Sequence, residues 1–369
     1  MLAARMLIGR AAADASQPLD RPTLVFVPSG SASRVTVIDG ASNRVVSTLD
    51  VAGRPSHVLV SEPTGTMVVS FEGRQALQLV SLARPGERSI LSLPLTPDAM
   101  VLSPDGYLVG LVDGARGSIA VVSLHQRKLL FELAIPGGPR HLAFSSDGSQ
   151  LYVTAARAPE LALVDIVQQS VISRATLGRP DATQTAASAL TRTPDGRHGF
   201  VALRDSDSVL VLNLSTLEPV KRLQVGRLPA RPWGTADGRL MLVPNEGDGS
   251  ISIIDAQALV VRATVPAVRD VAAINTGWFE SLAFVTSRTE RRVAVLDLMG
   301  FARLGDIELP AAPGAGVVND SGQKLFVSLA ETDQLAIIDT QRHALVSLVS
   351  GAGGRPSSAV IARTNNYCH

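Results

Sequence analysis

The stretch PRHLAFSSDGSQLYVTAARAPELALVDIVQQSVISRATL, residues 139–177, decides the fold. It holds four apolar runs of about five residues separated by Pro, Gly, Asp and Ser, a pattern that predicts an antiparallel meander of four strands. The pair Asp147-Gly148 favours a tight turn between the first two runs, because Gly supplies positive φ and Asp tolerates it. The same turn recurs at Ser103–Gly106, Thr193–Gly196 and Thr235–Gly238, and weaker copies stand at Glu62–Gly65 and Asn319–Gly322.

The third run of this unit recurs along the whole chain. Each copy ends on a small polar residue, and the steps between these ends are 42, 42, 42, 48, 42, 42 and 42 residues. A period of about 40 residues with strand-like content is typical of a β-propeller. The eight runs are Val35–Asp39, Leu77–Ser81, Ala120–Ser123, Leu161–Asp165, Val209–Asn213, Ile251–Asp255, Val293–Asp297 and Leu335–Asp339.

The two ends of the chain complement each other. The segment Arg355–Ile361 repeats the turn and the start of a first strand but has no outer strands after it. Three strand-like runs near the N-terminus, Leu24–Val27, Val35–Asp39 and Val45–Leu49, lack a first strand. We therefore predict an all-β, eight-bladed β-propeller of four-stranded antiparallel blades, closed by a blade shared between the N- and C-termini.

Composition fits this architecture and weakens several classes of function. Hydrophobic residues make up 46% and charged residues 18%, as expected when most strands are buried on both faces. The net charge is +1 without a basic block, so neither nucleic acid nor an anionic membrane is an expected partner. No apolar stretch approaches the length of a membrane span. Residues 22–369 are predicted to form one propeller domain.

Residues 1–21 precede the repeat. Arg5, the run Met6–Ile8 and the alanine-rich segment Ala11–Ala15 resemble the end of a secretory signal, but Arg10 interrupts a short apolar core. Two alternatives are open, a signal-peptide remnant or a disordered arm. The first predicts a periplasmic or secreted protein, and a single cysteine in the chain fits either compartment.

The repeated pattern Gly-x-Pro, apolar strand, Ser-Pro-Asp-Gly, strand and an apolar run ending in Ile-Asp resembles the YVTN-repeat propellers. The resemblance covers residues 23–364 and implies a mostly exported class of proteins. Eight blades also resemble the haem-binding propeller of the cytochrome-type nitrite reductases and their haem-biosynthetic relatives. That likeness makes haem a candidate cofactor.

Candidate ligand residues follow from the repeat. The turns that precede the first strands surround one mouth of a propeller channel, where ligand sites gather. In the haem propellers a His at the start of a first strand is the axial iron ligand, which by resemblance marks His57 or His141. In the alternative interpretation these rings only pack at the channel rim. The other candidates, four arginines for anionic groups such as propionates and one aromatic ring for stacking, are Arg54, Arg140, Arg231, Arg269 and Trp233.

Three further features remain. The adjacent Cys368 and His369 could contribute to a metal site, although two ligands are an incomplete set. The 48-residue step places six extra residues around Gly178–Ala187, either a lid over the channel or a tolerated insertion. No Gly-x-Ser-x-Gly, His-Glu-x-x-His or phosphate-binding glycine motif is present.

The favoured hypothesis is an extracytoplasmic binding or scaffold module without chemistry of its own, taking a protein partner or a small ligand at the channel face. A monomer is expected. Alternatives are a haem-binding or haem-handling propeller and a metal- or quinone-dependent oxidoreductase domain. The chain has no Cys-x-x-Cys-His motif for covalent haem attachment.

Overall fold

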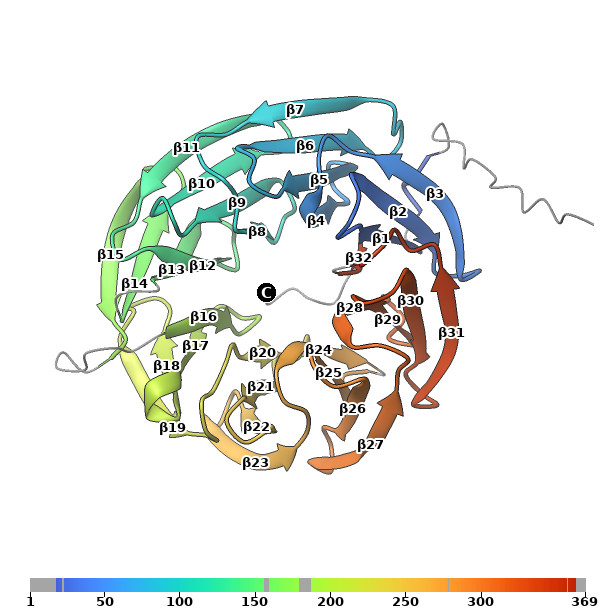
Figure 1. The fold of residues 1–369 in the computed structure, drawn as a ribbon. Coiled ribbons are helices and arrows are strands. Elements are labelled where there is room, and N and C mark those ends of the chain that lie inside the picture. Colours follow the sequence, from blue (N-terminus) through green and yellow to red (C-terminus); the bar gives the residue numbers. More distant parts are fainter. Residues whose placement is uncertain are drawn as a thin grey trace, which may run out of the picture.

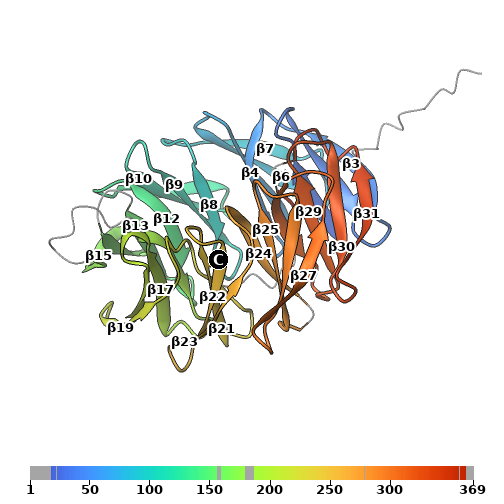
Figure 2. The same ribbon diagram turned by 60° about the horizontal axis from the view of Figure 1, so that its bottom comes forward.

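A computed structural model describes residues 18–21, 23–155, 159–178, 187–277, 279–356 and 358–362. These residues form eight four-stranded antiparallel sheets arranged in a ring around a central axis (Figures 1 and 2). The predicted eight-bladed β-propeller is confirmed. A single 3-10 turn, Arg204–Ser206, is the one helical element in the described part of the chain.

The strands of each blade follow one another in sequence, from the channel outward, except in the blade that closes the ring. From the innermost strand to the outermost, the closing blade consists of β32 (Val360–Ile361), β1 (Leu24–Pro28), β2 (Arg34–Asp39) and β3 (Arg44–Asp50). The next three blades are β4 (Pro55–Ser61), β5 (Thr66–Phe71), β6 (Ala76–Ser81) and β7 (Arg88–Ser92); β8 (Ala99–Leu102), β9 (Leu108–Asp113), β10 (Ser118–Ser123) and β11 (Lys128–Ala134); and β12 (Pro139–Phe144), β13 (Gln150–Ala155), β14 (Glu160–Asp165) and β15 (Ser170–Thr176). The last four are β16 (Ala187–Arg192), β17 (His198–Leu203), β18 (Ser208–Asn213) and β19 (Pro219–Gln224); β20 (Trp233–Gly234), β21 (Leu240–Asn245), β22 (Ser250–Asp255) and β23 (Val260–Pro266); β24 (Val271–Gly277), β25 (Leu282–Ser287), β26 (Arg292–Asp297) and β27 (Ala302–Glu308); and β28 (Pro313–Val318), β29 (Lys324–Leu329), β30 (Gln334–Asp339) and β31 (Ala344–Ser350).

The ring closes as the sequence predicts. Strand β32 pairs antiparallel with β1, in the register Val25 to Ile361 and Phe26 to Val360 (Figure 1). The amide of Gly30 also donates to the carbonyl of Arg355 at 3.0 Å. The C-terminal strand therefore supplies the inner edge of the blade whose other three strands come from the N-terminus.

The Asp-Gly turns have the predicted backbone. Gly106 and Gly148 have φ of 77° and 74°, in the left-handed region that suits glycine. In the first of these turns the hydroxyl of Ser103 donates to the carboxylate of Asp105 at 2.5 Å. The turn between β24 and β25 departs from the pattern, because its positive φ values fall on Phe279 and Glu280.

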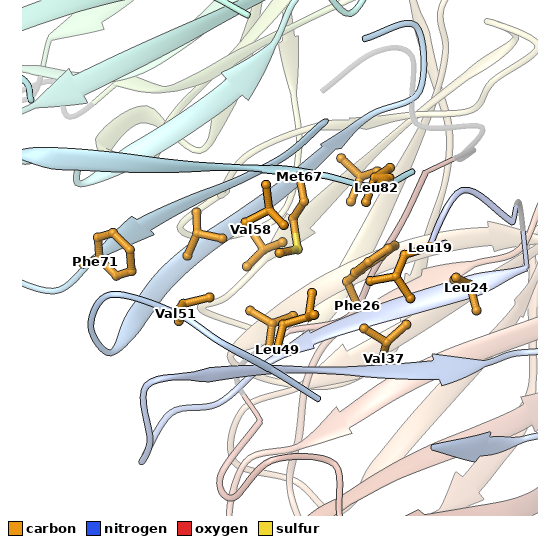
Figure 3. Close-up of a cluster of buried hydrophobic side chains, with 14 residues drawn as sticks. Leu19, Leu24, Phe26, Val37, Leu49, Val51, Val58, Met67, Phe71 and Leu82 are labelled. Atoms are coloured by element: carbon orange, nitrogen blue, oxygen red, sulfur yellow. The ribbon is translucent and has the colours of Figure 1, made fainter. Parts of the chain in front are cut away.

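The hydrophobic core lies between neighbouring blades. The buried residues form eight clusters, and each combines side chains from two adjacent sheets. Figure 3 shows the cluster between the closing blade and the blade of β4–β7, where Phe26 and Met67 are buried. Leu19, from the predicted arm of residues 1–21, packs into this cluster, and its amide donates to the carbonyl of Leu82 at 2.6 Å.

Candidate functional site

The inner strands surround a cavity of about 490 Å³ within the central channel. Its walls come from β4, β8, β12, β16, β28 and β32, on different sides of the ring. Most of the side chains in its wall are apolar, among them Leu59, Met100, Val101, Leu102, Phe144 and Val317. The polar members of the wall are Glu62, Ser103, Arg192 and Arg231. This volume falls within the range of about 300–1,000 Å³ that is usual for small-molecule sites.

The cavity lies at one end of the channel. Most of its lining residues stand toward the ends of the inner strands or in the turns that follow them, such as Pro63 and Pro104, whereas Arg231 stands before β20. Sequence reasoning favoured the other end, where the turns precede the inner strands. The space exists because the small residues Gly316, Ala359 and Ala362 face it, and this depends on residues from distant parts of the chain meeting across the ring.

Arg231 brings a positive charge into this cavity. It precedes β20, and the Thr191 hydroxyl of the neighbouring blade donates to the carbonyl of Pro232 at 2.6 Å, which fixes the segment. The guanidinium carbon lies 5.0 Å from the ring centroid of Trp233, a cation–π contact. Its Nε is buried and has no hydrogen-bond partner among the described residues. Burial lowers the pKa of Arg231 to about 10, so the side chain stays charged at neutral pH.

A second arginine, Arg192 at the end of β16, lines the same cavity. Its side chain is only 6% exposed, and Nε donates to the carbonyl of Phe144 at 2.9 Å. Sequence reasoning missed this residue. The signal was available, because Arg192 stands immediately before a Thr-Pro-Asp-Gly turn where other units have Leu102 or Phe144.

His141 lies on β12 and is half-buried. Burial, followed by the positive charges of Arg231 and Arg140, lowers its pKa from 6.5 to about 4. The imidazole is therefore neutral at neutral pH, the state in which it can coordinate a metal. It is not among the described residues that line the cavity.

His57 holds the corresponding position on β4. Burial lowers its pKa, and the Asp98 carboxylate opposes that shift. Its Nδ1 lies 3.5 Å from the hydroxyl oxygen of Ser70, which in turn is 2.7 Å from that of Ser56. Like His141, it does not line the cavity in the described part of the channel.

The other predicted residues have different surroundings. Arg54 forms an ion pair with Glu72, and Arg140 is exposed. The backbone of Arg269 is held on both sides: its carbonyl accepts a hydrogen bond from the Ser287 hydroxyl at 2.6 Å, and its amide donates to the Glu290 carboxylate at 2.8 Å. Arg231 is thus the member of the predicted set that the structure places in the cavity wall.

Cys368 and His369 lie outside the described residues, as does most of the predicted insertion, residues 179–186. Within the described ranges, no group of three or more His, Cys, Asp or Glu side chains is arranged to hold a metal ion. No helix in the same ranges has the length and apolar character needed to cross a bilayer.

Comparison with known proteins supports the repeat analysis. Residues 139–324, half of the chain, match the sequence profile of the YNCE-like beta-propeller family. The chain belongs to the YNCE-like β-propeller family. The predicted resemblance to repeat propellers is confirmed by this match. No relative among curated proteins matches the chain at a significant level.

Three solved structures resemble this member of the YNCE-like family. Dihydro-heme d1 dehydrogenase NirN, solved in complex with DHE, has a TM-score of 0.78 and 15% identity, covering 96% of this chain and 78% of its own. Hydrazine synthase from Kuenenia stuttgartiensis has a TM-score of 0.56 and 19% identity, covering 72% and 89%. A functionally unknown protein from Desulfotomaculum acetoxidans has a TM-score of 0.59 and 11% identity, covering 93% and 99%. At these identities the likeness shows the fold.

Proposed function

We propose that this propeller is a binding module that takes a predominantly apolar small molecule into the cavity of its central channel. The observation that carries the proposal is the cavity itself, about 490 Å³ lined mainly by apolar side chains. Several of these, including Leu59, Val101 and Leu102, stay partly exposed to the channel. Covering them with a ligand removes apolar surface from water, which favours binding.

A cavity-filling substitution tests this proposal. Val101→Trp adds bulk at a residue of the cavity wall, whereas Val46→Trp adds the same side chain on β3, where Val46 is 40% exposed. We expect saturable binding of an apolar fluorescent probe such as 1-pyrenebutanol to the parent and to Val46→Trp. Binding should weaken strongly in Val101→Trp. Equal binding by all three proteins would place the probe elsewhere and contradict the proposal.

A tetrapyrrole such as haem is the second candidate ligand. The observation that favours it is the pair of imidazoles, His57 and His141, whose lowered pKa values leave them neutral in the channel. The fit is partial. Arg231 suits an acidic side chain of such a ring, but no imidazole lines the cavity in the described part of the chain. The residues present there do not provide a histidine ligand for iron.

The absorption spectrum separates the two candidates. Haemin is added to the parent, to His57→Ala and to His141→Ala. A spectral shift that is lost in one variant supports the tetrapyrrole and names its ligand. The absence of any shift in the parent removes this candidate.

Location and assembly are part of the proposal too. We propose an extracytoplasmic protein, on the grounds of residues 1–21 and the exported class that the repeats resemble, and a monomer. Cell fractionation and light scattering of the purified protein test these two points. Recovery of the protein in the cytoplasmic fraction would contradict the proposed location, and a stable dimer would contradict the proposed monomer.

A further inference from the structure

The charge of Arg231 is poorly balanced by its surroundings. The residue lines the apolar cavity, and its Nε is buried without a hydrogen-bond partner. Within the described ranges, no carboxylate forms an ion pair with it. The guanidinium also lies over the face of Trp233.

A half-buried cation of this kind is unfavourable unless something compensates it. Removing a charge from water is costly, and a buried charge is normally paired. A cation–π contact recovers only part of this cost. The arrangement is therefore suited to an anion that arrives with the ligand.

The other charged or titratable groups near Arg231 are Glu62, whose residue shares the cavity wall, Arg192 and His141. The Arg192 guanidinium already donates to the carbonyls of Phe144 and Thr193, at 2.9 and 3.4 Å. His141, which feels the charge of Arg231, is neutral at neutral pH. Arg231, by contrast, donates no hydrogen bond within the described ranges, and one planar guanidinium can pair with one carboxylate.

We propose that the ligand is an apolar molecule carrying a single carboxylate-type anionic group, and that this group binds the guanidinium of Arg231. The inference rests on the proposed function, because it specifies the ligand of the same cavity. It predicts a preference for anionic over neutral ligands of equal size and shape. It also predicts that Arg231 is the source of that preference.

The first experiment uses three probes with the same aromatic body and different head groups. These are 1-pyrenebutyrate, 1-pyrenebutanol and a pyrenebutyl trimethylammonium salt, titrated into the full-length protein and followed by fluorescence anisotropy. A hydrogen bond to a charged group contributes about 1.5–3 kcal/mol, so the carboxylate should bind about 10-fold to 100-fold more tightly than the alcohol. The ammonium probe should bind more weakly than either.

The second experiment uses variants. Arg231→Met keeps an apolar chain of similar length and removes the charge, so the preference for the carboxylate should disappear while 1-pyrenebutanol still binds. Arg231→Lys keeps the charge and should retain part of the preference. Arg342→Met is the matched control, because that side chain is 78% exposed on an outer turn. It should bind all three probes as the parent does.

His141 provides an independent readout. The charge of Arg231 is one cause of its low pKa, so an anion on Arg231 should raise that pKa. A pH titration followed by histidine ring signals in NMR should show the rise with 1-pyrenebutyrate and not with 1-pyrenebutanol. A purely structural role of Arg231 would not produce this difference.

The outcomes separate the two proposals. Equal affinity of the parent for carboxylate and alcohol, with both weakened by Val101→Trp, overturns the anion inference and leaves the proposed function standing. Binding that Val101→Trp does not weaken overturns the proposed function. The probe series on the parent protein decides the charge preference even where Arg231→Met fails to fold.

Discussion

Acidification should destabilise the propeller through His141. The ring is held neutral by burial and by two arginines, so its pKa of about 4 in the folded state lies below its ordinary value of 6.5. Between these values the unfolded chain binds more protons than the folded one. Stability therefore falls as the pH drops from about 6.5 towards 4, and it is fully present above that range.

The size of the effect follows from the two pKa values. A tenfold difference in proton affinity corresponds to about 1.4 kcal/mol, so a change from pH 7 to pH 5 should lower the free energy of unfolding by at most about 2 kcal/mol through this residue. Partial contact of the ring with channel water makes this an upper value. The lowered pKa of His57 acts in the same direction.

The assay compares urea unfolding of the parent and His141→Gln at pH 7 and pH 5, followed by circular dichroism. Gln cannot take up a proton, so the parent should lose up to about 2 kcal/mol more than the variant between the two pH values. His57 and the surface carboxylates are common to both proteins and cancel in this difference. An identical loss in parent and variant would refute the assignment of a neutral, charge-surrounded His141.

Three further predictions follow from packing and charge. Leu19→Ala should lower the free energy of unfolding by about 2–4 kcal/mol, because the side chain is buried between two blades, and a urea titration measures this. Deleting residues 355–369 removes β32 and exposes the edge of β1, so the melting temperature of the whole ring should fall; an unchanged value would contradict closure by a shared blade. Without ligand, Arg231→Met should raise the melting temperature, because it removes a half-buried cation that has no ion pair among the described residues, and a lower value would count against that description.

The architecture could be predicted because its signals are local and repeated. All eight third strands end at the residues that the sequence pattern indicates, from Asp39 on β2 to Asp339 on β30. The closing strand was recognisable from the copy of the turn at Arg355 and Pro356. These features depend on hydrophobic alternation and on turn residues, which act within about ten positions of one another.

The cavity could not be predicted in the same way. Its walls combine residues as far apart in the chain as Leu59 and Ala359, and its volume depends on which side chains across the ring are small. The packing of Leu19 against the second blade is likewise a contact between elements. Arg231 was recognised as a channel residue, whereas Arg192 stood in a position that the repeat marks as apolar and was passed over.

The position of Arg231 is informative because it is unfavourable for the ring alone. Most side chains of the cavity wall are apolar, and a residue such as Met would fit the same wall without an unpaired charge. Natural proteins keep such destabilising groups chiefly where function requires them. The Thr191 hydroxyl fixes the segment of Arg231 through the Pro232 carbonyl, and Trp233 packs against the guanidinium, so little ordering is needed on binding. A propeller that served only as an inert scaffold would have no use for this cation, which is why the channel, rather than the outer surface, is the part of the molecule to test first.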